Sequence, residues 1–71
     1  GARMEKLTLD EIEKLPRDYI TVFEASAAMG INPQTFYRHV SELPFPLFKV
    51  GRRYRIPKKP FMDYMRSGKT G

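Results

Sequence analysis

The chain has 71 residues, no cysteine and a net charge of +5, with 13 Lys/Arg against 8 Asp/Glu. A chain of this length forms one domain with a small core and lacks the volume for a deep substrate cavity. Without cysteine it has no disulfide and no thiol chemistry, and no stretch reaches the roughly 20 apolar residues of a membrane span. We therefore expect a cytoplasmic domain with no membrane partner.

The positive charge is concentrated in the C-terminal half. Residues 1–33 hold four Lys/Arg and six Asp/Glu, a net of −2, whereas residues 34–71 hold nine Lys/Arg and two Asp/Glu, a net of +7. Such asymmetry indicates a nucleic acid or another anionic surface as partner. A membrane surface would favour one basic amphipathic helix, whereas much of this charge falls in a predicted β-hairpin.

The N-terminal part predicts a short helix. Thr8 and Glu11 form a capping box, and a helix from Leu9 to Leu15 follows, ended by Pro16. Its apolar side predicts packing against the rest of the domain. The alternative is a contact surface for a neighbouring copy or another protein.

The next segment predicts two short helices joined by a tight turn. Thr21 and Glu24 form a second capping box, and Gly30 supplies a left-handed stop about two turns later. Asn32-Pro33 then provides a cap and a proline at the first position of a helix expected to run to about Glu42. Two helices across a short glycine-containing turn make a helix-turn-helix.

The second of these helices has two faces. Phe36, Val40 and Leu43 recur at i, i+4 and i+7 and are expected to face the core. The opposite face carries polar groups that suit base edges and phosphates in a major groove: Gln34, Arg38 and Ser41, with Thr35 and Tyr37 on its flanks. A merely solvated face is the alternative for this helix taken alone.

A basic β-hairpin is predicted next. Residues 47–50 and 53–56 alternate at period two around Gly51-Arg52, a two-residue turn signal. We expect one apolar face and one cationic face: Phe48, Val50, Tyr54 and Ile56 on the first, and Lys49, Arg53 and Arg55 on the second, with Arg52 at the tip. Like charges that oppose each other destabilise a sheet, so an anionic partner such as DNA is favoured.

A last helix is expected from about Pro60 to Arg66, with Phe61, Tyr64 and Met65 facing inward. Three further residues are candidates for DNA phosphates: Thr21 at the start of the first motif helix, and Lys58 and Lys59 before the last helix. Solvated lysines are the alternative for the latter two. The chain thus divides into residues 1–3, which resemble a remnant of an expression tag, a helical brace over 4–18, a DNA-binding domain over 19–66, and a frayed tail over 67–71.

The order T-V-F-E-A-S-A-A-M-G-I-N-P-Q-T-F-Y-R followed by F-P-L-F-K-V-G-R-R-Y-R-I-P resembles the excisionase family. These small winged-helix proteins are recombination directionality factors of phages and integrative elements, and they are similar to the DNA-binding domain of MerR-type regulators. The resemblance covers roughly Tyr19 to Met65. It implies a small α+β fold, a winged helix-turn-helix of the MerR or excisionase type, here with an extra N-terminal helix.

No catalytic arrangement is evident in the sequence. His39 is the only histidine, and no cysteine or carboxylate cluster offers it partners for a metal. We interpret it as a partly buried packing residue. No serine has a suitable His/Asp constellation, and there is no phosphate-binding glycine loop. We expect neither enzymatic activity nor a metal or other cofactor.

The resemblance implies a function on double-stranded DNA. Such proteins bind repeated sites cooperatively, bend attachment-site DNA and direct an integrase toward excision, which would place this one on DNA in the cytoplasm of a bacterial host. A small prophage-type transcriptional regulator on the same fold is the first alternative. A protein-interaction module for an acidic partner is the second.

Overall fold

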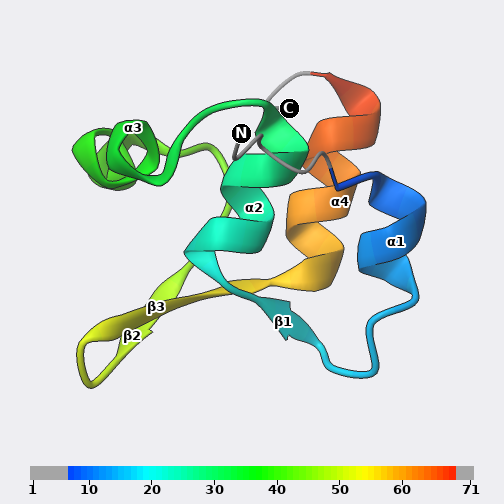
Figure 1. The fold of residues 1–71 in the computed structure, drawn as a ribbon, viewed down its shortest axis with the longest axis horizontal. Helices are drawn as coiled ribbons and strands as arrows, with labels where there is room; N and C mark the ends of the chain where they lie inside the picture. Colours follow the sequence, from blue (N-terminus) through cyan, green and yellow to red (C-terminus); the bar gives the residue numbers. More distant parts are fainter. Residues whose placement is uncertain (1–6, 69–71) are drawn as a thin grey trace, which may run out of the picture.

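The computed structural model describes residues 7–68. The predicted tag remnant at 1–3, residues 4–6 of the predicted brace and residues 69–71 of the predicted tail lie outside this range. The elements in chain order are α1 (Leu9–Glu13), β1 (Tyr19–Ile20), α2 (Val22–Met29), α3 (Pro33–Arg38), the 3₁₀ helix η1 (Val40–Glu42), β2 (Phe48–Val50), β3 (Arg53–Pro57) and α4 (Lys58–Ser67) (Figure 1).

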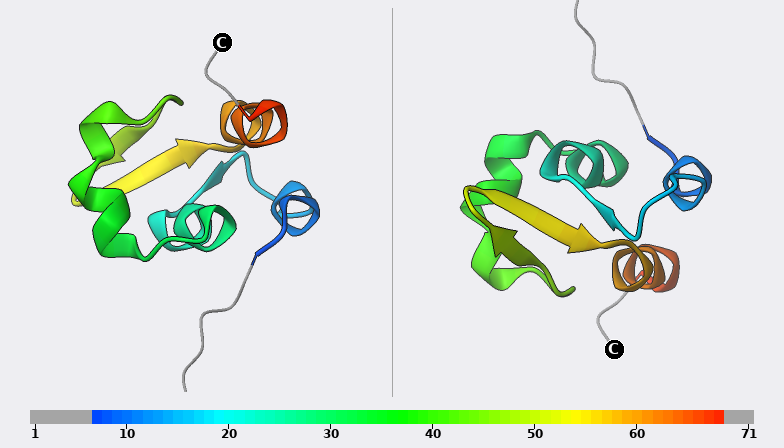
Figure 2. Two further views of the ribbon diagram at one scale, coloured as in Figure 1. Left: turned by 90° about the horizontal axis from the view of Figure 1, so that it is seen from above. Right: turned by 90° about the horizontal axis from the view of Figure 1, so that it is seen from below.

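The elements form a small α+β domain with two distinct ends. The β2–β3 hairpin and α3 lie at one end, α1 and α4 lie at the other, and α2 lies between them (Figures 1 and 2). The sheet is antiparallel in the order β1-β3-β2, with Ile20 opposite Ile56. This is the winged helix-turn-helix architecture that the sequence predicts. The pairing of β1 with β3 was not among the sequence predictions.

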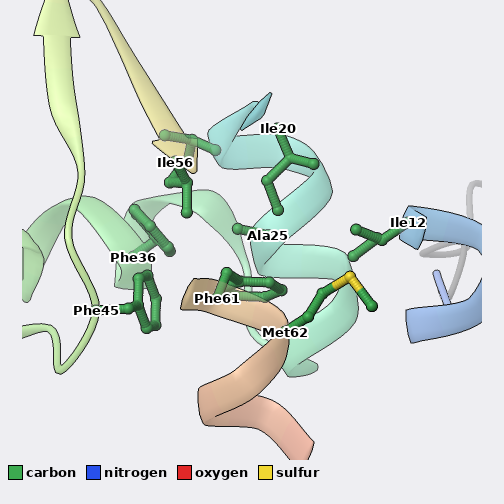
Figure 3. Packing of buried hydrophobic residues seen from close by; sticks show 9 residues of the cluster. Ile12, Ile20, Ala25, Phe36, Phe45, Ile56, Phe61 and Met62 are labelled. Carbon is green, nitrogen blue, oxygen red and sulfur yellow. The ribbon is translucent and has the colours of Figure 1, made fainter. Parts of the chain in front are cut away.

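One core connects these elements, except β2, whose three residues are exposed. Its buried residues are Ile12, Ile20, Val22, Ala25, Phe36, Phe45, Ile56, Phe61 and Met62 (Figure 3). The Phe45 ring meets the Phe61 ring edge to face, with centroids 5.0 Å apart, and lies 6.5 Å from the Phe36 ring. Edge-to-face pairs of this kind add to the stabilisation that comes from burying apolar area. The aromatic cluster thereby fixes α3 to α4 through the loop that carries Phe45.

The local signals at the helix ends are confirmed. Both predicted capping boxes are present, at Thr8 and at Thr21, and Gly30 ends α2 in the left-handed region with φ of 77°. The Thr35 N–H donates to the side-chain oxygen of Asn32 at 2.9 Å, as expected for an N-cap. These interactions join residues three positions apart, so the helix starts can be predicted from local sequence.

The predicted extent of the second motif helix is wrong. The α-helix ends at Arg38 rather than at Glu42, and η1 replaces its last turn. Pro44 disfavours a helical conformation at Leu43, which is extended with ψ of 144°. The His39 N–H is shared between the Thr35 and Phe36 carbonyl oxygens, at 3.3 and 3.1 Å, so the chain tightens into a 3₁₀ turn there.

His39 is exposed, so its interpretation as a packing residue is also wrong. Its Nδ1 lies 3.4 Å from a carboxylate oxygen of Glu42. Val40, in contrast, packs against the core as predicted, although it stays partly exposed. Because the chain tightens after Arg38, the His39 side chain is in solvent whereas the next side chain, Val40, packs against the core.

The two outer helices also differ from their predicted bounds. The first helix, α1, ends at Glu13 instead of Leu15, because Leu15 precedes Pro16 and is disfavoured in a helix. The last helix, α4, begins at Lys58, two residues before Pro60. Pro60 therefore occupies the first helical turn, where its missing N–H is not needed. Phe61 is buried as predicted, and Met62 is buried although the sequence analysis did not place it in the core.

Among residues 7–68, Ser26 is the one polar residue that is buried with the core. It lies in α2, is 1% exposed, and its hydroxyl has no hydrogen-bond partner within residues 7–68. A buried hydroxyl without a partner is unfavourable, and alanine is a better helix former. We expect Ser26→Ala to raise the free energy of unfolding by about 1 kcal/mol. Urea denaturation measures this directly, and a loss of stability would show that the hydroxyl makes a bond in solution.

Candidate nucleic-acid interface

The exposed face of α3 presents polar side chains at one end of the molecule. Gln34 and Arg38 are exposed, and among residues 7–68 neither makes a hydrogen bond or ion pair through its side chain. Thr35 is half-buried, and its hydroxyl donates to Asn32 Oδ1 at 3.1 Å. Ser41 is exposed but lies in η1, beyond the end of α3. Gln34 and Arg38 are therefore the groups on α3 with the most freedom to bind a partner.

The predicted division of the hairpin into an apolar and a cationic face is wrong. In the observed register Phe48 is opposite Arg55, Lys49 is opposite Tyr54 and Val50 is opposite Arg53. Residues directly opposite each other in an antiparallel pair lie on the same face of the sheet. The two-residue turn at Gly51-Arg52 pairs even-numbered residues of one strand with odd-numbered residues of the other. The predicted apolar residues have even numbers in both strands, so those of β2 and those of β3 lie on opposite faces of the hairpin.

The hairpin therefore has an inner face toward α3 and an outer face away from it. On the inner face, the Tyr54 ring lies 6.0 Å from the ring of Tyr37 on α3, and Lys49 Nζ lies 5.5 Å from the Tyr54 ring centroid. On the outer face, Phe48 and Val50 are about half exposed beside the two arginines. The Tyr37–Tyr54 contact sets the position of the hairpin relative to α3.

The arginines of the hairpin differ in their surroundings. The Arg55 guanidinium lies 4.4 Å from the ring centroid of Tyr19, in a cation–π arrangement. Arg52 and Arg53 are exposed, and the structure shows no ion pair for either among the described residues. Arg55 is therefore held in place before any partner arrives, whereas Arg52 and Arg53 extend freely from the tip region.

Comparison with known families identifies this arrangement. A family model described as a helix-turn-helix domain matches residues 19–69. The chain belongs to this helix-turn-helix domain family. The matched segment runs from β1 to the end of α4 and so includes both α3 and the hairpin, and membership indicates that the protein binds DNA. Searches of curated proteins and of solved structures gave no match.

An ion pair holds the start of the helix-turn-helix in place. The two terminal guanidinium nitrogens of Arg17 donate to the Glu24 carboxylate, at 2.9 and 2.6 Å, and one of them also donates to the Tyr19 carbonyl oxygen. The bonds from Arg17, the N–H of Thr21 and the charge of Arg17 hold the pKa of Glu24 below its usual value. Both side chains are about one quarter to one third exposed. The sequence analysis did not predict this pair, since Glu24 was already explained by its capping box.

The lowered pKa of Glu24 makes stability depend on pH. A carboxylate with a folded-state pKa below the unfolded value stabilises the fold above the unfolded pKa, and this contribution is lost as pH falls through the folded pKa. Glu24→Gln should therefore cost about 1 kcal/mol at neutral pH, allowing for partial solvent screening, and nothing in acid below the folded pKa. Thermal melts of the wild type and of Glu24→Gln, from neutral pH to below the folded-state pKa of Glu24, measure this difference in stability. A difference that stayed constant with pH would rule out the charge as its source.

The candidate phosphate residues outside α3 and the hairpin have different surroundings. Lys58 Nζ donates to the carbonyl oxygens of Glu13 and Leu15, at 3.1 and 2.8 Å, and so holds the end of α1. Thr21 is engaged in its capping box with Glu24, through both its N–H and its hydroxyl. Lys59 is exposed. Lys58 thus has a bracing role in this helix-turn-helix domain, whereas the Lys59 ammonium group has no hydrogen-bond or ion-pair partner among residues 7–68.

A groove of about 240 Å³ separates the start of α2 from α3 and β3. Its lining residues are Thr21, Val22, Phe23, Tyr37, Arg53, Tyr54 and Arg55. It combines two guanidinium groups with three aromatic rings. A second cavity, of about 490 Å³, lies between the ends of α1 and α4 and has a mixed-charge lining that includes Asp18, Lys59 and Arg66. The first groove lies between the two parts of the domain that are expected to contact DNA.

Two further findings bear on other kinds of site. Within residues 7–68, no three His, Cys, Asp or Glu side chains gather closely enough to hold a metal ion. No helix in that same range has the length and apolar character needed to cross a membrane.

Proposed function

We propose that this helix-turn-helix protein is a sequence-specific architectural factor of the excisionase type. It binds repeated sites cooperatively, bends attachment-site DNA and directs an integrase toward excision. The observation that carries the proposal is the placement of the polar face of α3 beside a cationic hairpin, linked by the Tyr37–Tyr54 contact. The matching family also includes excisionase-like proteins.

In this proposal α3 enters the major groove of the DNA. Arg38 donates to the O6 and N7 atoms of a guanine, and Gln34 pairs with the N6 and N7 atoms of an adenine. Tyr37, Thr35 and Ser41 contact phosphates or base edges at the margins of α3. Lys49, Arg53 and Arg55 bind phosphates, and Thr21 and Lys59 add backbone contacts at the edges of the interface.

Cooperative binding follows from the small size of the domain. One short helix and one hairpin provide few base contacts, so a single copy has limited specificity in a genome. Several copies on neighbouring sites supply the missing discrimination. The exposed faces of α1 and α4 lie at the end of the molecule away from α3 (Figure 1) and are the surfaces we propose for contact between copies or with the integrase.

A footprint on the DNA that flanks the gene of this protein tests the proposal. We expect several protected repeats that fill cooperatively in a titration, and a circular-permutation gel shift that reports a bend. Adding the neighbouring integrase should then produce excision that depends on this protein. Independent filling of the sites would rule out the cooperative part.

A transcriptional regulator is the second candidate, because the family match covers a DNA-binding unit that serves both functions. A single unbent site that overlaps a promoter would favour this candidate. Binding to every DNA no tighter than non-specific binding would instead favour a protein-interaction module for an acidic partner.

The tip of the hairpin is expected to sense the width of the minor groove. An arginine inserted there favours narrow A·T-rich DNA, whereas a cation that only neutralises a phosphate has no sequence preference. Arg52→Ala, or Arg53→Ala if that side chain is the one inserted, should lose more affinity on an A·T-rich flank than on a G·C-rich one. Competition binding with two duplexes that differ only in the flank measures this.

Lys49→Ala and Arg55→Ala are the matched controls. Each should weaken binding to both duplexes equally and reduce the salt dependence by about one charge. If the tip variants behave like these two, the hairpin grips only the backbone and the groove-insertion part of the proposal is wrong.

A further inference from the structure

Phe23 is the most exposed large apolar side chain among residues 7–68, at 70%. It lies in the first turn of α2, two residues after the cap Thr21, and does not contribute to the core. A single exposed apolar residue needs no explanation. Phe23, however, lines the groove between α2, α3 and β3 together with two other aromatic residues, Tyr37 and Tyr54. An apolar wall in a cationic groove suggests a ligand that is part charged and part apolar.

The edge of β3 that borders this groove is open. The pairing of β1 with β3 stops at Ile20 opposite Ile56, after which the chain turns into α2. On the other side, the pairing of β2 with β3 runs up to Val50 opposite Arg53, the two residues that flank the turn. Among residues 7–68, the stretch from Arg53 to Arg55 therefore has a strand partner only on the β2 side.

We infer that this groove seats one nucleotide of the DNA backbone, with its phosphate on Arg53 and Arg55 and its deoxyribose on the ring of Phe23. The inference deepens the proposed DNA-binding function and rests on it. Three features support it: the charge of the two arginines, the apolar ring beside them, and the position of the groove where α2, α3 and β3 meet. A polynucleotide strand alternates an anionic phosphate with a largely apolar sugar, which matches this lining.

The inference predicts a distinct type of contact. Burial of the Phe23 ring against a sugar strengthens binding without releasing counterions, so its contribution should not depend on salt. It should also be the same for every sequence, because all nucleotides share the same backbone. These two properties distinguish Phe23 from Arg38, which is proposed to read a base, and from the phosphate-binding arginines.

The test measures DNA affinity by fluorescence anisotropy over a range of salt concentrations, on the footprinted site and on an unrelated duplex. Phe23→Ser should weaken binding about tenfold on both duplexes with an unchanged salt slope. Phe23→Leu, which stays apolar, should retain most of the affinity. Arg55→Ala, which removes the other phosphate-binding arginine of the groove, should instead reduce the salt slope by about one charge. Melting curves should be nearly unchanged for both Phe23 variants, because the side chain is exposed.

Phe48→Ser is the matched control, since Phe48 is 49% exposed on the outer face of the hairpin and does not line the groove. Its affinity should be close to that of the wild type. Equal losses for Phe23→Ser and Phe48→Ser, or no loss for Phe23→Ser while the wild type binds DNA, would overturn the inference. Loss of integrase binding with DNA affinity intact would assign the groove to a protein. Failure of the wild type to bind any DNA would instead reject the proposed function.

Discussion

Replacement of Phe36 by alanine is expected to remove most of the stability of the domain. Phe36 is fully buried, and its ring contacts the aromatic cluster through Phe45. Truncation of a buried phenylalanine typically costs about 3–5 kcal/mol, because the cavity left behind collapses only in part. A single small core rarely supplies more than about 3–5 kcal/mol in total. The variant should therefore be largely unfolded at room temperature.

Circular dichroism and urea denaturation measure this effect. Gln34→Ala is the matched control, since Gln34 lies on the exposed face of the same helix and should change stability by less than about 0.5 kcal/mol. An unchanged melting temperature for Phe36→Ala would contradict its placement in the core.

The second large effect is expected at Arg38, this time on binding. Arg38→Ala should weaken binding to the specific site by about 1–3 kcal/mol and relax discrimination at one base position. Non-specific binding should fall much less, because only the charge contributes there. The affinities of specific and unrelated duplexes, measured at one salt concentration, give the result. The fold should be unaffected, since Arg38 is exposed.

Arg38→Lys separates charge from geometry. Lysine keeps the positive charge but lacks the planar fork that bonds guanine O6 and N7 in a bidentate manner. We expect the lysine variant to recover non-specific affinity while most of the discrimination stays lost. Full discrimination by Arg38→Ala would show that α3 does not read bases through this residue.

The structure changes how the basic half of the chain is understood. Lys58 holds the end of α1, Arg66 pairs with Glu13 at 3.0 Å, and Arg55 lies on the Tyr19 ring. Lys58 and Arg66 therefore stabilise the contact between α1 and α4. The positive charge that remains available to DNA is concentrated on α3 and on the hairpin, at the opposite end of the molecule (Figure 1).

Local sequence was sufficient to predict the helix-turn-helix and the hairpin turn. The capping boxes at Thr8 and Thr21, the cap at Asn32 and the left-handed Gly30 all depend on residues within four positions of one another. The same holds for the turn at Gly51-Arg52. The exposed polar face of α3 also follows from the spacing that buries Phe36. These signals depend on neighbouring residues alone and not on tertiary contacts, so they can be recognised in the sequence.

The tertiary structure decided which side chains meet. The faces of the hairpin depend on the strand register, and an offset of one residue exchanges every side chain between the two faces. Tyr19 lies beside Arg55, and Lys58 reaches the end of α1 across more than 40 residues of sequence. The exposed position of Phe23 in the groove is likewise set by three elements together. Local periodicity carries no information on such contacts, because they join residues that only folding brings together.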